Sequence, residues 1–190
     1  MYLVFDIETK NTFDEVGSNN PKDLETSYVG YYRSDTQKYE GVFEDEIVSK
    51  LFPILKEAEQ VIGYNIIFFD IPALTRYGEL NIPKERLVDL YKITSAQTKV
   101  YTKLDNWAQA TLGKGKIGHG LDAIRYWREK DLDSLVKYCN MDVEITKELF
   151  EYVEKNHKLK YTDGLGKIQE VEVTIPKQEA PASPLQSSMF

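Results

Sequence analysis

YLVFDIE, residues Tyr2 to Glu8, is an apolar, β-rich run with one acid inside it and a second at its end, and it predicts a buried strand. Side chains alternate across a strand, so Asp6 and Glu8 project to one face. Two carboxylates on one face of a buried strand repel each other, and a bound cation would offset that repulsion. The alternative is a strand end with solvated acids. The Asp-x-Glu spacing alone does not choose between the two, because an acid-rich chain contains it by chance.

The residues that follow predict an antiparallel meander. Lys10 to Thr26 is polar and contains Asn, Gly, Ser and Pro, which indicates a loop. Ser27 to Arg33 (SYVGYYR) and Lys38 to Val42 (KYEGV) are typical of strands, and the polar residues Ser34 to Thr36 form a turn between them. Together with the first strand, they give three consecutive strands of one sheet.

Helical patterns dominate the sequence from there to residue 156. In Glu44 to Gln60 the apolar residues recur at three- and four-residue spacing, which predicts an amphipathic helix, and Val61 to Ile66 is a short apolar strand. We further expect a helix from Pro72 to about Tyr77, a short strand or helix within Pro83 to Tyr91 ending near Ile93, a helix over Leu104 to Leu112, a mobile basic loop over Gly113 to Gly120, and the longest helix over Asp131 to Asn156. This order predicts an α/β protein of the ribonuclease H-like kind, with a mixed central sheet that contains the antiparallel three-strand meander and is flanked by helices.

The domain is expected to span residues 1–156, because a chain of 190 residues is long enough for one full hydrophobic core. Residues 157–175 form a C-terminal extension, in which Lys167 to Ile175 (KIQEVEVTI) alternates like a strand. Residues 176–190 contain prolines, serines and alanines and have little to bury, so we expect a disordered tail.

The composition excludes several classes of protein. Cys139 is the single cysteine, so an internal disulfide is excluded, and there is no Cys/His cluster of the kind that binds zinc. The apolar stretches are too short for a membrane span. The start of the sequence, MYLVFDIETK, lacks the charged lead, long apolar run and cleavage site of a signal peptide. We therefore expect a cytoplasmic protein with no membrane partner.

The formal net charge of −7 argues against nucleic acid as a partner, unless the acids are concentrated at a metal site whose cations supply local positive charge. The basic residues are also concentrated, because the segment from Lys99 to Arg128 has only two acids, Asp105 and Asp122. This segment is interpreted as a guide for a phosphate backbone, and the alternative is a solvated loop. Its basic residues are Lys99, Lys103, Lys114, Lys116, Arg125 and Arg128, with His119 as an ordinary loop residue.

Three further polar residues are candidates for the same site as Asp6 and Glu8, namely Asp70, Tyr138 and Asp142. Asp70 stands where a strand passes into a helix, which suits a third oxygen ligand but equally suits a helix cap. Tyr138 and Asp142 are four residues apart on the longest predicted helix, and they share a face next to its apolar stripe, which includes Cys139. As an isolated pair, they are better explained as a tyrosine at the core boundary and a solvated acid.

In this order, the residues resemble the three exonuclease motifs of the DEDD superfamily, also called DnaQ-like, which has the ribonuclease H-like fold. The motifs are Phe5-Asp6-Ile7-Glu8-Thr9, Asn65-x-x-x-Phe69-Asp70 and Tyr138-x-x-x-Asp142. Tyr138 resembles the tyrosine subclass, since the histidine subclass would carry His there. The segment Leu104-Asp105-Asn106-Trp107-Ala108 is similar to the proofreading domain of family B DNA polymerases and to stand-alone relatives. The resemblance spans about residues 1–156, without the polar insert after Thr9 and the basic loop.

The resemblance implies a 3′→5′ exonuclease that releases nucleoside monophosphates from the 3′ end of single-stranded DNA or RNA, with two divalent ions, Mg²⁺ or Mn²⁺. By analogy with the family, Asp6 bridges both ions, Glu8 and Asp142 complete the site of the ion that activates water, and Asp70 serves the second ion. Tyr138 would orient the attacking water. The candidates for substrate binding are Thr9, Asn65, Phe69, Lys114 and Lys116. Phe69 could equally belong to the core, and Asn65 could only satisfy backbone groups.

Two other functions stay open at this point. A catalytically silent domain of the same fold would bind nucleic acid or a partner protein, and it would typically have lost a carboxylate, whereas none is lost here. A structure-specific endonuclease is the other, although the spacing of Tyr138 and Asp142 favours the exonuclease. The sequence does not choose DNA or RNA, because that depends on contacts to the 2′-OH. A polymerase, a helicase or another nucleic-acid-processing protein would fit as a partner.

Overall fold

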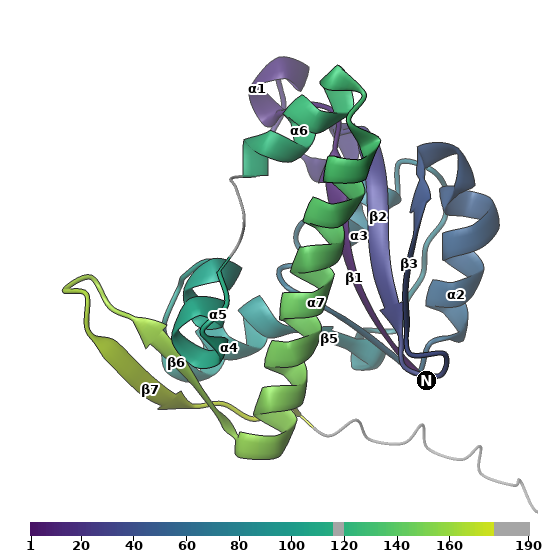
Figure 1. Cartoon of the computed structure of the whole chain (residues 1–190). Helices are drawn as coiled ribbons and strands as arrows, with labels where there is room; N and C mark the ends of the chain where they lie inside the picture. The colour runs from purple at the N-terminus through teal and green to yellow at the C-terminus, as the bar shows by residue number, and fades with distance from the viewer. Residues whose placement is uncertain (116–119, 177–190) are drawn as a thin grey trace, which may run out of the picture.

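The computed structural model describes residues 1–115 and 120–176, and it has a central five-stranded sheet in the order β3-β2-β1-β4-β5 (Figure 1). β1 pairs antiparallel with β2 and parallel with β4. β3 continues the antiparallel part and β5 the parallel part, so the predicted mixed sheet with its meander is confirmed. The strands are β1 (Tyr2–Thr9), β2 (Thr26–Arg33), β3 (Lys38–Phe43), β4 (Gln60–Gly63) and β5 (Leu87–Asp89).

Helices cover both faces of this sheet. The longest, α7, runs across β1 and β2 on one face, and α2 and α3 pack on the other (Figure 1). Within the described part of the chain, none of the helices combines the length and the apolar character needed to cross a membrane. The helices are α1 (Phe13–Val16), α2 (Phe52–Glu57), α3 (Asp70–Leu74), α4 (Leu90–Thr98), α5 (Leu104–Leu112), α6 (Gly120–Glu129) and α7 (Leu132–Asn156).

The two faces of β1 are buried against different helices. Phe5 and Ile7 belong to the core that includes α2 and α3. Val4 belongs to the core on the opposite face, together with Val143 of α7. Because side chains alternate along a strand, Asp6 and Glu8 lie on the same face as Val4, which is the face that α7 covers.

Gly30 of β2 allows α7 to approach the sheet closely. It lies opposite Asp6 of β1 in the antiparallel pair. A Cβ atom at Gly30 would lie 2.7 Å from Oδ1 of Asn140 and 3.1 Å from Sγ of Cys139, both on α7. The first distance is shorter than a real Cβ contact, so a side chain at this position would have to displace the Asn140 amide, whereas glycine allows the close packing. The helix is therefore seated on the sheet at the level of Asp6.

The single helix predicted over Glu44 to Gln60 is wrong. A 3₁₀ turn over Glu44–Glu46 is followed by a π turn over Ile47–Leu51, and regular α-helix begins only at Phe52. Pro53 has no N–H to donate, so it interrupts the α-helical hydrogen-bond ladder at this place. The apolar face is nevertheless as predicted, because four of its positions are fully buried: Ile47, Leu51, Leu55 and Ala58.

Other predicted boundaries shift by a few residues. The strand expected over Val61 to Ile66 ends at Gly63, and the helix expected from Pro72 begins at Asp70 and ends at Leu74. The predicted helix over Leu104 to Leu112 is confirmed. The segment from Pro83 contains a 3₁₀ turn, β5 and the start of α4, while the loop after Thr9 holds α1 and a 3₁₀ turn (Pro21–Asp23). The sequence did not predict α6.

A two-stranded hairpin follows α7, where the sequence predicts only the second strand. β6 (Lys158–Thr162) pairs antiparallel with β7 (Ile168–Glu172), and the hairpin lies beside α5 (Figure 1). The amide of Asn106 donates to the carbonyl oxygen of Thr162 at 2.9 Å, and the hydroxyl of Thr111 donates to the carbonyl oxygen of Lys160 at 3.0 Å.

Most of the predicted tail, residues 177–190, lies outside the described residues, as do residues 116–119 of the basic loop.

Candidate active site

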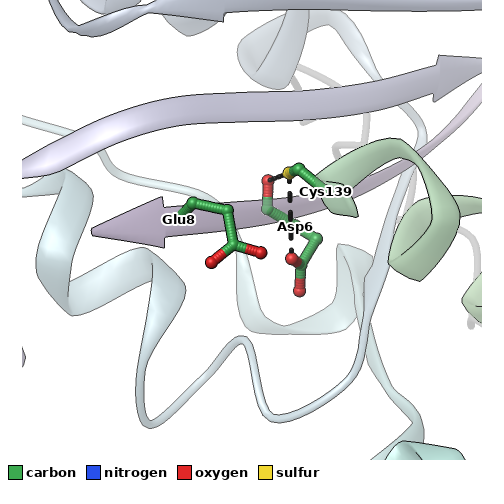
Figure 2. A group of neighbouring side chains, drawn as sticks. All are labelled: Asp6, Glu8 and Cys139. Atoms are coloured by element: carbon green, nitrogen blue, oxygen red, sulfur yellow. Dashed lines mark hydrogen bonds between the residues drawn. The ribbon is translucent and has the colours of Figure 1, made fainter. Parts of the chain in front are cut away.

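Asp6 and Glu8 extend from one side of β1, beside Cys139 of α7 (Figure 2). One carboxylate oxygen of each acid and the Sγ atom of Cys139 all lie within 4.8 Å of one another. Glu8 is 8% exposed and Asp6 is partly buried. The two acids are therefore not a solvated strand end, and their like charges are held close together inside the protein.

Asp70 is connected to β1 by a hydrogen bond. Its Oδ1 atom accepts from the backbone N–H of Ile7 at 3.1 Å, and Ile7 lies between Asp6 and Glu8. Asp70 is 2% exposed. The N-cap residue of α3 is Phe69, so helix capping does not explain Asp70. Its carboxylate instead faces the strand that carries the other two acids.

The pKa of Asp70 is raised to about 7. Burial is the largest cause, and the negative charges of Asp89 and Asp142 raise the pKa further. Backbone hydrogen bonds from Ile7 and from Asp70 itself act in the opposite direction. The acid is thus surrounded by like charges, and a bound cation would reverse the effect on its pKa.

Tyr138 and Asp142 lie one turn apart on α7, and both are buried. The ring of Tyr138 packs against Tyr126 of α6, with 6.5 Å between the ring centroids. The charge of Asp142 raises the pKa values of both Asp70 and Cys139, which places it in the same group of acids. The alternative interpretation, a solvated acid at position 142, is therefore wrong.

Cys139 is a buried neutral thiol within this group. Its Sγ lies 3.4 Å from the backbone carbonyl oxygen of Asp6, to which the thiol donates, and 3.9 Å from the Oδ2 atom of the same residue. Burial raises the pKa of the thiol well above its ordinary value, and the charges of Asp6 and Glu8 add to the effect. The sequence places Cys139 in the apolar stripe of its helix, but it does not show that the thiol contacts Asp6.

The donor atoms suit a hard divalent cation. Asp6, Glu8, Asp70 and Asp142 offer carboxylate oxygens, which are the ligands that Mg²⁺ and Mn²⁺ prefer. Burying several like charges together is unfavourable, and the raised pKa of Asp70 is a direct consequence of it. Divalent cations would relieve this repulsion, so the residues fit a metal site of this kind.

Asp89 is a buried acid that supports the site and that sequence reasoning missed. Its carboxylate accepts from the backbone N–H groups of Asn65 (2.9 Å), Ile67 (3.0 Å) and Lys92 (3.2 Å). The bonds from Asn65 and Ile67 fix the turn between β4 and α3, which ends at Asp70, and the bond from Lys92 caps α4. The available signal was an acid between an apolar strand and a helix, which is the same signal that drew attention to Asp70.

Three predicted substrate-binding residues lie close to the carboxylates along the chain. The Thr9 hydroxyl donates to the carbonyl oxygen of Asn11 at 3.0 Å, and Thr9 follows a register shift at the end of β1. Asn65 has a left-handed backbone, with φ of 69°. Phe69 is half-buried, and its ring meets Phe13 of α1 edge-on at 6.1 Å. Phe69 therefore has both a core contact and an exposed part.

The basic segment is largely paired with acids where it is described. Lys114 lies 3.0 Å from a carboxylate oxygen of Glu144 and 2.6 Å from one of Glu148, both on α7. Arg125 pairs with Asp122 and Glu129, and Arg128 pairs with Glu15. Lys116 and His119 lie outside the described residues. Trp107 is fully buried, so it is a core residue.

The fold and the buried acids define an α/β domain of the nuclease-like class. The family model of the RNase_H superfamily matches residues 3–154, a range that runs from β1 to the last turn of α7. The chain therefore belongs to the ribonuclease H superfamily. Domains of this superfamily act on nucleic acids and usually bind divalent metal ions. No curated protein matches the chain.

Proposed function

We propose that this protein is a metal-dependent 3′→5′ exonuclease of the tyrosine subclass of DEDD enzymes, acting on single-stranded DNA or RNA. The observation that carries the proposal is the gathering of acids from three elements. β1 supplies Asp6 and Glu8, α3 begins with Asp70, and α7 supplies Asp142. The like charges of these buried groups require compensation, which divalent cations provide.

The four carboxylates would hold two Mg²⁺ or Mn²⁺ ions, with Asp6 shared between them. Glu8 and Asp142 would serve one ion and Asp70 the other. Such ions supply positive charge at the scissile phosphate and lower the pKa of water. The Cys139 thiol, which donates to the backbone of Asp6, would keep that residue in place.

The remaining residues would position the reactants. Tyr138 would hold the attacking water by a hydrogen bond, because phenols are in general protonated at neutral pH and are poor bases there. Thr9, Asn65 and Phe69 would hold the terminal nucleotide. Lys114 would contact a phosphate after leaving Glu144 and Glu148, and Lys116 would assist it.

A circular single strand, which has no 3′ end, tests the proposal most simply when it is compared with linear strands. A linear single-stranded DNA labelled at its 5′ end, the RNA of the same sequence and a circular single strand are incubated with Mn²⁺, with Mg²⁺ or with EDTA. The linear strands should shorten nucleotide by nucleotide from the 3′ end, and the circle should persist. Cleavage of the circle would favour an endonuclease. Binding of the linear strands without products would favour the silent binding domain.

A further inference from the structure

A groove of about 780 Å³ lies along β5, the strand at the edge of the sheet opposite β3. One wall comes from the turn before α3 and from α3 itself, and the other from α4. The lining is mainly apolar, and it includes Ile67, Phe68, Ile71, Leu87, Ile93 and Ala96. Charged side chains are added by Lys84, Lys92 and Glu85.

Phe68 is unusual because it is an aromatic residue that is 59% exposed in the turn leading to the active site. It directly precedes Phe69 and is separated by one residue from Asp70. An exposed aromatic ring on a firm backbone is the kind of surface on which an unpaired base stacks. The backbone is firm here because Asp89 accepts from the N–H of Ile67, the residue before Phe68, at 3.0 Å.

The charges on the groove favour an anionic partner. Lys84 and Lys92 are exposed, and neither has an ion pair within residues 1–115 and 120–176. Glu85 is the one exposed acid among the lining residues, because Asp89 is buried and accepts three backbone hydrogen bonds. The exposed charges of the groove are thus two cations and one anion, and the buried Asp89 brings the formal charge of the whole lining to zero, in a chain whose formal net charge is −7.

We propose that this groove binds the unpaired nucleotides that precede the 3′-terminal nucleotide of a single strand, with one base on Phe68 and phosphates on Lys84 and Lys92. The inference rests on the proposed function, since it names the second contact of the same substrate. Asp89 joins the two places, because it lines the groove and holds the turn that ends at Asp70. A strand leaving the carboxylates over this turn would meet Phe68 first.

The test measures the affinity of full-length protein for a fluorescein-labelled octathymidylate, in the Asp6→Asn background so that hydrolysis does not consume the probe. Phe68→Ala and the double substitution Lys84→Ala/Lys92→Ala are compared with matched controls at the opposite edge of the sheet and on α2, Tyr39→Ala and Lys38→Ala/Lys56→Ala. Each groove variant should weaken binding by about tenfold, as expected for one stacked base or for two phosphate contacts. The controls should stay within about twofold, since their side chains do not line the groove.

Salt dependence separates contact with phosphate from a general loss of structure. Each lost phosphate contact lowers the slope of log Kd against log salt by about 0.7 for a single strand, so the double lysine variant should lose about 1.4. An unchanged affinity in both groove variants, or an equal loss in the controls, overturns the proposal. Loss with the lysines alone, with Phe68→Ala unaffected, also overturns it, because no base would then stack there.

The proposed function is separated from this inference by hydrolysis in the chain with Asp6 intact. Wild-type protein should degrade an octanucleotide with a higher kcat/KM than a dinucleotide. Phe68→Ala should bring the kcat/KM for the octanucleotide closer to the kcat/KM for the dinucleotide. Hydrolysis with the same kcat/KM for both lengths would overturn the proposed binding by the groove and would support the proposed exonuclease. Binding by the groove without hydrolysis in any metal would support the groove and overturn the proposed enzyme.

Discussion

The Sγ atom of Cys139 lies 3.4 Å from the backbone carbonyl oxygen of Asp6, so α7 contacts β1 at the residue that carries the first carboxylate. Asp142 follows Cys139 by three residues, which is a little under one helical turn. The distance between the acids of β1 and the acid of α7 is therefore set by how closely the helix sits on the sheet. Gly30 permits this closeness, because the space of its missing side chain is taken by Asn140 and Cys139.

Gly30→Ala should destabilise the protein and reduce its nuclease activity together. The added methyl group would lie 2.7 Å from Oδ1 of Asn140 and 3.1 Å from Sγ of Cys139, so the Asn140 amide must rotate or α7 must shift. Overpacking of this kind lowers the free energy of unfolding by about 1–3 kcal/mol. Urea unfolding measures the loss, and Gly164→Ala is the control, since nothing lies within 4 Å of the Cβ position there. Equal stability of the two variants would contradict the proposed packing.

Asp89→Ala should lower both stability and activity, although Asp89 is not one of the proposed metal ligands. The substitution leaves the N–H groups of Asn65, Ile67 and Lys92 without their acceptor, and we expect a loss of about 3 kcal/mol or more. Asp163→Ala is the control, because it removes a half-buried acid that accepts from two backbone N–H groups in the β6–β7 turn. That control should keep its nuclease rate, and an equal rate for Asp89→Ala would show that the turn does not position Asp70.

In EDTA, Asp70 should make the protein less stable as the pH rises from about 4 through 7. The folded-state pKa of about 7 lies above the ordinary value of 3.8, so the folded state keeps a proton that the unfolded chain releases. The unfolded state then binds fewer protons, and the free energy of unfolding falls with rising pH across this window. Relative to Asp70→Asn, the wild type should lose stability between these pH values and regain it with Mn²⁺. A difference between the two proteins that does not change with pH would refute this.

Asp142→Asn should separate the structural from the metal-binding effect of the acids. In EDTA the variant should be at least as stable as the wild type, because one of several like charges is gone. Mn²⁺ should raise the Tm of the wild type, since a ligand that binds only the folded state stabilises it, and should raise the Tm of the variant much less. Glu154→Gln, an exposed acid on α7, is the control and should respond to Mn²⁺ like the wild type. A full Mn²⁺ response in Asp142→Asn would remove Asp142 from the metal site.

Tyr138→Phe should slow turnover less than the loss of a carboxylate. The ring packs against Tyr126, and phenylalanine keeps that contact, so the Tm should hardly change. Loss of a single hydrogen bond to water should reduce kcat by about tenfold. Single-turnover kinetics with saturating enzyme measure the chemical step directly. A loss as complete as that of Asp6→Ala would mean that the tyrosine does more than position water.

The alternation of β1 and the spacing on α7 predict which side chains share a face of each element. Local rules govern both: strand residues two apart share a face, and helix residues four apart share a face. The three-strand meander followed for the same reason, because its signals are alternation and turns. That Asp6 and Glu8 lie near Asp142 and Asp70 was implied only by the resemblance to the exonuclease motifs.

Features that depend on contacts between distant segments could not be predicted in this way. Gly30 reads as a glycine within a strand, and only the packing of α7 shows why it is there. Asp89 reads as the cap of α4, and its two bonds to the turn after β4 appear only in three dimensions. α6 has a clear helical periodicity, but its segment is polar on average and buries only Ala123 and Ile124, so the sequence analysis overlooked it. Lys114 reads as a free cation, yet it lies between two acids of α7.

The central claim is that the carboxylates of β1 act through divalent ions on the 3′ end of a single strand. The most direct measurement is a time course on a 5′-labelled single-stranded DNA with Mn²⁺, run in parallel for the wild type and for Asp6→Asn purified in the same way. A ladder of products shortened from the 3′ end, which is absent in EDTA and absent for Asp6→Asn, is the predicted result. No products from folded wild-type protein with Mn²⁺, or the same ladder from Asp6→Asn, would contradict the claim.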